Sequence, residues 1–235
     1  MPSCKDYYIG LHEKCQNTIG QAFDSKEARR LHKAHSFAED FRKIVLALGE
    51  RPEKEIFDES YNEFCMSLYA ALIGKHRQAY MSLRYFLEST LFAIKISADL
   101  VAFAKWKNGN KDVAWASLID RDNGIYSYDF VTAFFYEIKD EAKDVNGIAE
   151  VSYRKCSEYI HGNRHTFGLP ALAFVERNIF QWLELADNVK YIILFSLIMR
   201  YGHELCVDSK NTIEEIVLEE LGSIGPIRAI FSCKS

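Results

Sequence analysis

The sequence predicts an all-α protein that folds as a single helical bundle of about seven to nine helices, two of them long. Apolar residues recur every three or four positions through most of the chain, which is the spacing of one face of an α-helix. Only four prolines occur among 235 residues, and three of them separate these periodic stretches. No alternating apolar pattern is followed by a two-residue hairpin turn, so strands are not expected.

The predicted organisation is one domain over residues 1–235. It would hold N-terminal helices over 1–50, a helical hairpin over 51–106, short helices over 111–162 and C-terminal helices over 171–235. Within it we find no internal repeat, low-complexity tract or linker, which is why a second domain is not expected.

The first half of the chain carries the clearest helical patterns. Residues 25–48 place apolar side chains at alternating steps of three and four, and Gly49 follows directly. A second helix is predicted over 57–74, and a long third one over 76–106 would pair with it as an antiparallel hairpin. The tract 107–111 is rich in Asn and Gly, which accept positive φ, and therefore predicts a turn.

The second half begins with shorter elements. Helices are predicted over 112–119 and 127–137, separated by a turn, and Asn146 is expected to cap a helix that ends near Gly162. A loop over 163–170 follows.

Two further helices are expected after this loop. One is the second long helix, over about 175–203, and the other is a last helix over 212–221.

Composition excludes several classes of protein. A net charge of −4 provides no general attraction for nucleic acid or anionic membranes, so any polyanion site must be local. The most apolar windows fall short of the roughly 18 uninterrupted residues that span a bilayer, so no membrane association is expected. The N-terminus does not resemble a signal peptide, and the six cysteines form no metal-binding or disulfide pattern. We therefore expect a cytoplasmic protein with reduced thiols, no metal and no cofactor.

The segment 146–162 sorts its side chains into stripes when it is placed on a helix of about 100° per residue. One stripe is an apolar seam that should be buried, formed by Ala149, Tyr153, Cys156 and Ile160. The stripe beside it is polar and consists of Glu150, Arg154, Ser157, Glu158 and His161. A guanidinium, a hydroxyl, a carboxylate and an imidazole would therefore share one side of this helix.

This polar stripe suits chemistry on a phosphodiester. His161 can transfer a proton near neutral pH, and Arg154 can bind phosphate oxygens with two parallel hydrogen bonds. Glu158, one turn from each, could orient both. The structural alternative is an ordinary i,i+4 ion pair between Arg154 and Glu158 on a solvated face, with His161 merely ending the helix.

The stretch 153–162, YRKCSEYIHG, resembles the signature of the HEPN superfamily, in which an arginine is followed after four to six residues by a histidine. Here six residues separate Arg154 from His161, and Lys155 stands where family members frequently carry Asn, Asp or His. Members are all-α bundles, and many are metal-independent endoribonucleases that act as toxins, in phage defence or in RNA processing.

The resemblance implies that Arg154 and His161 are catalytic. The ribose 2′-hydroxyl would attack the adjacent phosphate and leave a 2′,3′-cyclic phosphate without any metal. One imidazole cannot be both the base and the acid of an in-line displacement, so we expect a homodimer with a composite active site. RNA is the expected substrate, and an antitoxin or a defence-system component is an expected partner.

Five residues are weaker candidates for contacts with the substrate. Arg84 and Glu88 lie on the predicted long helix and would either position Arg154 or the substrate, or form an internal ion pair that fixes helix register. Arg164 and His165 follow the motif helix in a loop and would reach a substrate phosphate. Ser157 would also contact the substrate.

Two hypotheses in which the protein is not an enzyme remain open. One is a helical module that binds RNA, nucleotide or a partner protein with the same polar stripe, because some HEPN members are inactive binding modules. The other is an interaction subunit with no role in nucleic-acid chemistry.

Overall fold

The computed structural model describes residues 3–161, 163–168 and 170–232, and it confirms the predicted all-α bundle, with no strand in this part of the chain. The α-helices follow in the order α1 (Cys4–Phe23), α2 (Ala28–Ala47), α3 (Lys54–Leu72), α4 (His76–Ile96), α5 (Leu100–Lys107), α6 (Trp115–Leu118), α7 (Tyr128–Phe135), α8 (Lys139–Ile160), α9 (Glu176–Tyr201), α10 (Val207–Leu221) and α11 (Gly225–Ser232). Two short 3₁₀ turns are η1 (Tyr136–Ile138) and η2 (Arg164–Thr166).

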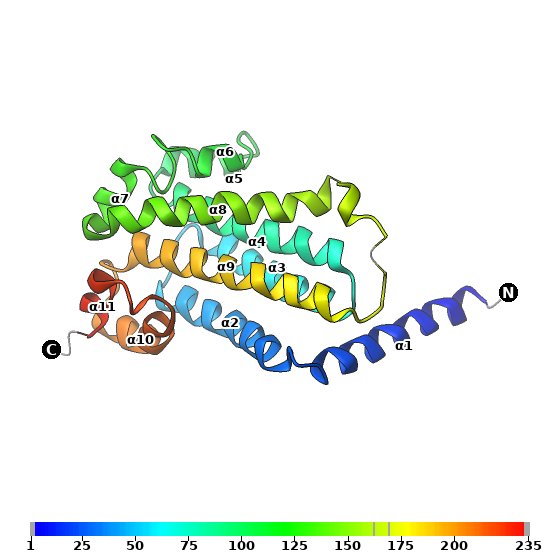
Figure 1. Cartoon of the computed structure of the whole chain (residues 1–235). Helices are drawn as coiled ribbons and strands as arrows, with labels where there is room; N and C mark the ends of the chain where they lie inside the picture. The colour runs from blue at the N-terminus through cyan, green and yellow to red at the C-terminus, as the bar shows by residue number, and fades with distance from the viewer. Residues whose placement is uncertain (1–2, 162, 169, 233–235) are drawn as a thin grey trace.

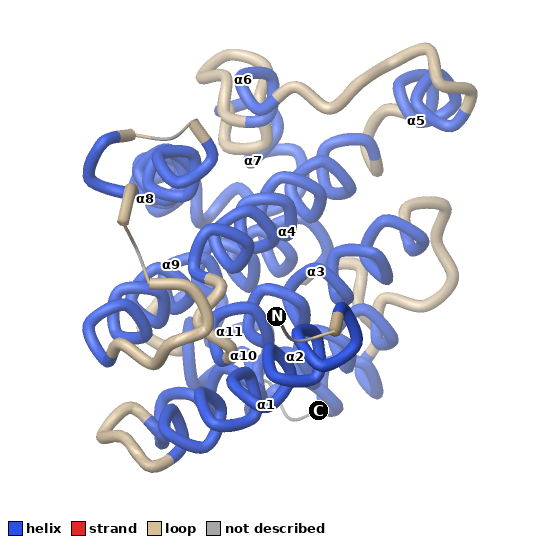
Figure 2. The backbone as a smooth tube through the Cα atoms, turned by 90° about the vertical axis from the view of Figure 1, so that its right-hand side faces the viewer, coloured by secondary structure: helices blue, strands red, loops and turns tan. Residues whose placement is uncertain are grey.

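Helices α4 and α9 form the centre of the bundle. The predicted hairpin is present, because α3 and α4 pack along their lengths, and α4 also packs against α8 and α9. In Figure 1 the helices α8, α9 and α2 run across the molecule, with α3 and α4 behind them, and Figure 2 shows α4 lying between α8 and α3. Every residue of α9 from Ile192 to Tyr201 is buried, and all but Ser196 and Arg200 are apolar. A helix that is apolar around nearly its whole circumference is typically enclosed by neighbours on all sides.

The core between α2, α3 and α4 is aromatic. Phe86 of α4 has 0% of its surface exposed, and its ring centroid lies 5.2 Å from that of Phe41, 6.2 Å from that of Phe37 and 5.0 Å from that of Phe64. These distances and the tilted or edge-on ring planes match the geometry that aromatic pairs prefer. The three helices are therefore joined through one ring.

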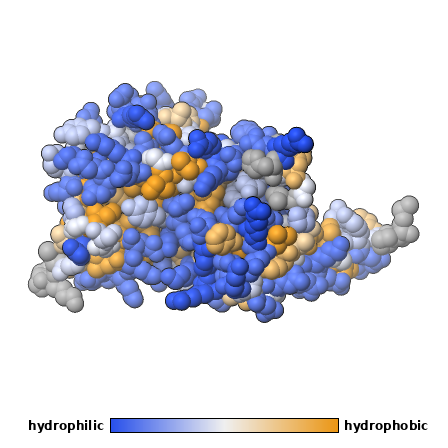
Figure 3. Space-filling model, in the orientation of Figure 1, coloured by the Kyte–Doolittle hydropathy of each residue, from blue (hydrophilic) through white to orange (hydrophobic). Residues whose placement is uncertain are grey.

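Helix α1 extends away from this core. Its N-terminus carries a capping box, in which Ser3 and Asp6 each accept a hydrogen bond from the other's backbone N–H. Only Thr18 and Ala22, near its C-terminal end, are buried, and Figure 1 shows its N-terminal end projecting from the bundle. Figure 3 shows that hydrophilic residues cover most of this face of the molecule, with apolar residues exposed in smaller groups.

The predicted single helix over 76–106 is wrong, because the chain breaks between α4 and α5. Asp99 accepts a hydrogen bond from the backbone N–H of Ala102 at 2.8 Å and so caps the N-terminus of a new helix. Ser97 donates back to the carbonyl of Ile94 at 2.7 Å where α4 ends. These two hydrogen bonds between side chains and the backbone replace the hydrogen bonds of a continuous helix, and α4 therefore ends before α5 begins.

The role predicted for Asn146 is also wrong. Helix α8 begins seven residues earlier, at Lys139, where Asp140 and Glu141 in the first turn complement the helix dipole. Asn146 lies inside the helix, and its side-chain amide donates to the carbonyl of Ile119 at 3.2 Å.

Shorter elements differ from the prediction as well. The helix predicted over 112–119 is reduced to the single turn α6, and α11 was not predicted. Within the described ranges, no helix combines the length and the apolar character that crossing a bilayer requires.

The burial of His76, at the start of α4, leads us to expect that the free energy of unfolding depends on pH in a specific way. It is 3% exposed, and burial lowers the pKa of its imidazole to about 4. In the unfolded chain the ring titrates near ~6.5, so between about pH 6.5 and pH 4 the unfolded state binds a proton that the folded state does not. The free energy of unfolding therefore falls as the pH decreases through this window.

Between pH 7 and pH 4 we expect the wild type to lose about 3 kcal/mol more of this free energy than His76→Leu does. Urea unfolding in phosphate-free buffer at each pH measures the difference. An identical pH dependence of the two proteins would contradict a neutral buried imidazole.

Candidate functional site

The predicted motif helix is the C-terminal half of α8, and its seam faces the bundle as expected. Ala149 and Cys156 are fully buried, while Tyr153 and Ile160 are half-buried against neighbouring helices. Burial also raises the pKa of the Cys156 thiol to about 12, so this cysteine is an inert part of the core. Packing of the seam determines which side of α8 remains open.

Arg154 and His161 both lie on the open side of α8. They are exposed and seven residues apart, which places them on the same side and about 10 Å apart along the axis. His161 ends the helix, with a near-helical backbone (φ −80°, ψ 3°) and an N–H that donates to the carbonyl of Ser157 at 3.0 Å. Five cavities on the described surface have volumes of about 240 to 520 Å³, and neither residue lines any of these five.

Arg154 has no hydrogen bond or ion pair within the part of the chain that the structure describes. The i,i+4 ion pair with Glu158 that the spacing allowed is thus not formed. The guanidinium keeps its donors available to an external acceptor.

Ser157 and Glu158 are half-buried beside this open side. The Ser157 hydroxyl donates to the backbone carbonyl of Tyr153 at 2.8 Å, so its proton is engaged within the helix. Glu158 lines a cavity of about 400 Å³ between α8 and α9, together with Lys155 and Glu184. Glu158 therefore faces the groove toward α9.

Arg164 belongs to η2, just beyond the motif helix, and is exposed. The turn is closed by the N–H of Phe167, which donates to the carbonyl of Arg164 at 3.2 Å. The side chain of the second predicted loop residue, His165, lies outside the described part of the structure. Arg164 thus adds a cation to the same end of the molecule as His161.

Arg84 and Glu88 lie on the other side of the seam. They form an ion pair of 3.8 Å between Arg84 Nε and Glu88 Oε2, which is one of the two predicted alternatives. The Arg84 guanidinium also stacks 4.3 Å from the ring centroid of Tyr153 and donates to its hydroxyl. Trp115 covers the ring of Tyr153 in a parallel stack at 3.9 Å. The sequence pattern did not reveal this stack, because the three aromatic and cationic groups come from α4, α6 and α8.

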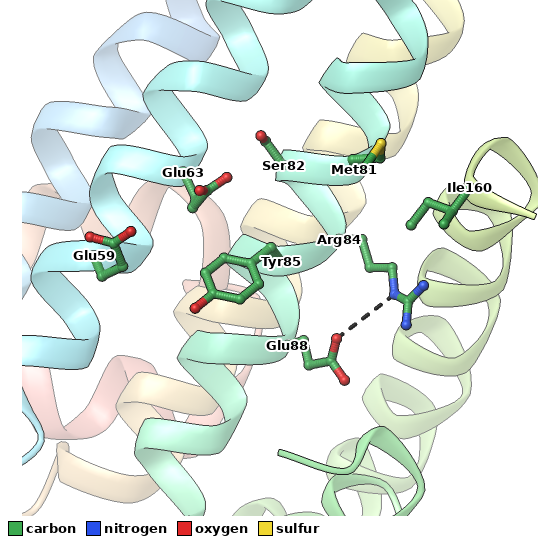
Figure 4. Close-up of a pocket in the computed structure, with 8 residues that line it drawn as sticks. All are labelled: Glu59, Glu63, Met81, Ser82, Arg84, Tyr85, Glu88 and Ile160. Atoms are coloured by element: carbon green, nitrogen blue, oxygen red, sulfur yellow. Dashed lines mark ion pairs between the residues drawn. The ribbon is translucent and has the colours of Figure 1, made fainter. Parts of the chain in front are cut away.

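The cavity next to Arg84 is acidic. It has a volume of about 520 Å³, and Figure 4 shows Glu59 and Glu63 of α3 facing Tyr85 and Glu88 of α4, with Ile160 at its α8 side. Burial raises the pKa of the Glu88 carboxyl, an effect that Arg84 opposes. Three carboxylates against one guanidinium make this large cavity unsuitable for a polyanion.

The contact between Arg84 and Tyr153 predicts a measurable coupling. A double-mutant cycle with Arg84→Met and Tyr153→Leu should give about 1 kcal/mol of interaction, because a half-buried cation–π pair is partly desolvated. The free energy of unfolding in urea measures each corner of the cycle. Additive effects of the two substitutions would show that the pair contributes nothing to the joining of α4 and α8.

No group of three or more His, Cys, Asp or Glu side chains in the described ranges is placed to hold a metal ion. Comparison with known proteins adds no relative, because no family model, curated protein or solved structure matches the chain.

Proposed function

We propose that this protein is a metal-independent endoribonuclease of HEPN type whose active site forms between two copies of the chain. The observation that carries the proposal is the joint exposure of Arg154 and His161 on one side of α8, with the Arg154 guanidinium unpaired in the described structure. An unpaired guanidinium on the same side of a helix as an exposed imidazole, two turns away, can bind a phosphodiester while the imidazole transfers a proton.

The chemistry divides between the two side chains. Arg154 binds nonbridging phosphate oxygens and stabilises the charge that develops on them as the ribose 2′-hydroxyl attacks. His161 transfers a proton, either from the attacking hydroxyl or to the leaving 5′-oxygen. The product ends are a 2′,3′-cyclic phosphate and a free 5′-hydroxyl.

The two-fold dimer supplies the second imidazole. Because Arg154 and His161 are exposed and line none of the five cavities described above, a second copy can approach them directly and place its own His161 across the scissile phosphate. Val151, one turn before Arg154 and 40% exposed, offers an apolar contact on this side. A role as a toxin or a phage-defence effector, restrained by an antitoxin or a defence-system partner, rests on the family resemblance alone.

The deciding experiment incubates the purified protein with total RNA in excess EDTA and maps the product ends. Cleavage that leaves cyclic phosphates supports the proposal, and cleavage only after addition of a divalent metal contradicts it. Light scattering at high protein concentration tests the dimer, and a strictly monomeric protein would contradict the composite site.

A second candidate is a helical module that binds RNA without cleaving it. It is favoured by the absence of Arg154 and His161 from the linings of these five cavities, so that the described part of one chain does not bring the two groups together in any of them. Binding of labelled RNA that depends on Arg154, with no cleavage under any condition, would establish this candidate in place of the nuclease.

A further inference from the structure

A small basic cavity lies between the N-terminus of α4 and residues at and beyond the end of η2. It has a volume of about 240 Å³, and its described walls are residues 74–78 on one side and residues 166–168 and 170–171 on the other. Lys75 and Arg77 line it, and none of the described lining residues is a carboxylate. The cavity is therefore positively charged, in contrast to the larger acidic cavity beside Arg84.

His76 is the residue of this cavity that the fold alone does not explain. Its side chain is 3% exposed and lines the cavity, and neither ring nitrogen has a hydrogen-bond partner among the residues that the structure describes. Buried polar groups in folded proteins are nearly always hydrogen-bonded, and an orphaned imidazole costs stability. A ligand in the cavity would supply the missing partner.

The start of α4 is itself an anion-binding environment. No side chain caps this helix, and within the described ranges the backbone N–H groups of residues 76–78 have no acceptor. These N–H groups carry the positive end of the dipole of a 21-residue helix. Lys75 and Arg77 are half-buried and have no ion pair in the described structure. Backbone N–H groups, two cationic side chains and the imidazole of His76 therefore all belong to residues that line this one cavity.

We propose that this cavity binds a phosphate group, held by the N-terminus of α4, Lys75, Arg77 and the ring of His76. The volume is below that of pockets for drug-sized ligands, which start near ~300 Å³, and fits a single phosphate with little attached. One wall is tightly closed, because a Cβ on Gly74 would lie 2.6 Å from the carbonyl oxygen of Ala173. Inorganic phosphate and the phosphate of a mononucleotide share this chemistry. The proposal does not depend on the ribonuclease activity proposed above.

Calorimetric titration with sodium phosphate and with adenosine 5′-monophosphate, each at matched ionic strength, tests the proposal. We expect saturable binding by the wild type that weakens about tenfold or more in Arg77→Gln, because a charge-assisted pair is lost. Arg42→Gln removes the same charge from an exposed position on α2 and should bind as the wild type does. Tighter binding of the nucleotide identifies a phosphate monoester as ligand, and equal binding identifies the free anion.

Amide shifts of residues 76–78 in ¹⁵N NMR spectra provide a local readout for the wild type. They should move with the same midpoint as the calorimetric titration and stay unchanged in sodium chloride. Absence of saturable binding, or equal affinity of the wild type and Arg77→Gln, would overturn the proposal. Lys75→Gln, at the half-buried N-cap position of α4, serves if Arg77→Gln does not fold.

Discussion

Replacing His161 by alanine is expected to lower the rate of RNA cleavage by at least about 100-fold, because a positioned proton donor or acceptor contributes that much or more. Arg154→Ala should cause a loss of about 100- to 1,000-fold, since it removes a donor aimed at the developing charge. Both side chains are exposed, and Arg154 has no partner in the described structure. The free energy of unfolding should therefore change by less than about 0.5 kcal/mol in either variant.

Single-turnover cleavage of a labelled RNA in excess EDTA measures these losses. His35→Ala and Arg42→Ala are matched controls, because both residues are exposed on α2, away from α8, and should leave the rate unchanged. Full activity in His161→Ala would remove this imidazole from the mechanism. Equal losses in all four variants would point to general charge or folding effects instead of a specific site.

Replacing Phe86 by alanine should be the most damaging core substitution among the α4 aromatics, at about 3–5 kcal/mol. The ring is completely buried and contacts Phe37 and Phe41 of α2 and Phe64 of α3. Its removal leaves a cavity at the point where three helices meet and also ends three aromatic contacts. Urea unfolding should show a large decrease in the midpoint.

Phe180→Ala is the matched control for this substitution. Phe180 is 43% exposed on α9 and contacts the Arg30 guanidinium at 5.2 Å from its ring centroid. Its loss should cost about 1 kcal/mol or less. Similar costs at Phe86 and Phe180 would mean that the α2–α3–α4 core is not packed around Phe86.

Helices that are specified by the local spacing of apolar residues could be predicted from the sequence. The helices predicted over 25–48 and 57–74 correspond to α2 and α3, because their apolar residues recur at helical steps and a glycine stops each pattern. The break before α5 was not predictable from periodicity, since apolar residues continue through it and a single capping side chain, Asp99, decides it. The local sequence predicts that Asn146 caps a helix, yet its side-chain amide donates to the carbonyl of Ile119, 27 positions away.

The candidate site shows the same division. That Arg154 and His161 share one side of a helix follows from their spacing, because seven residues make two helical turns. That this side is open, that Arg84 packs on Tyr153 and that His76 is buried in a basic cavity could not be predicted without the three-dimensional arrangement of the helices. Helical periodicity depends on residues that are close in the sequence. What a side chain faces depends instead on the packing of segments that are far apart in the chain.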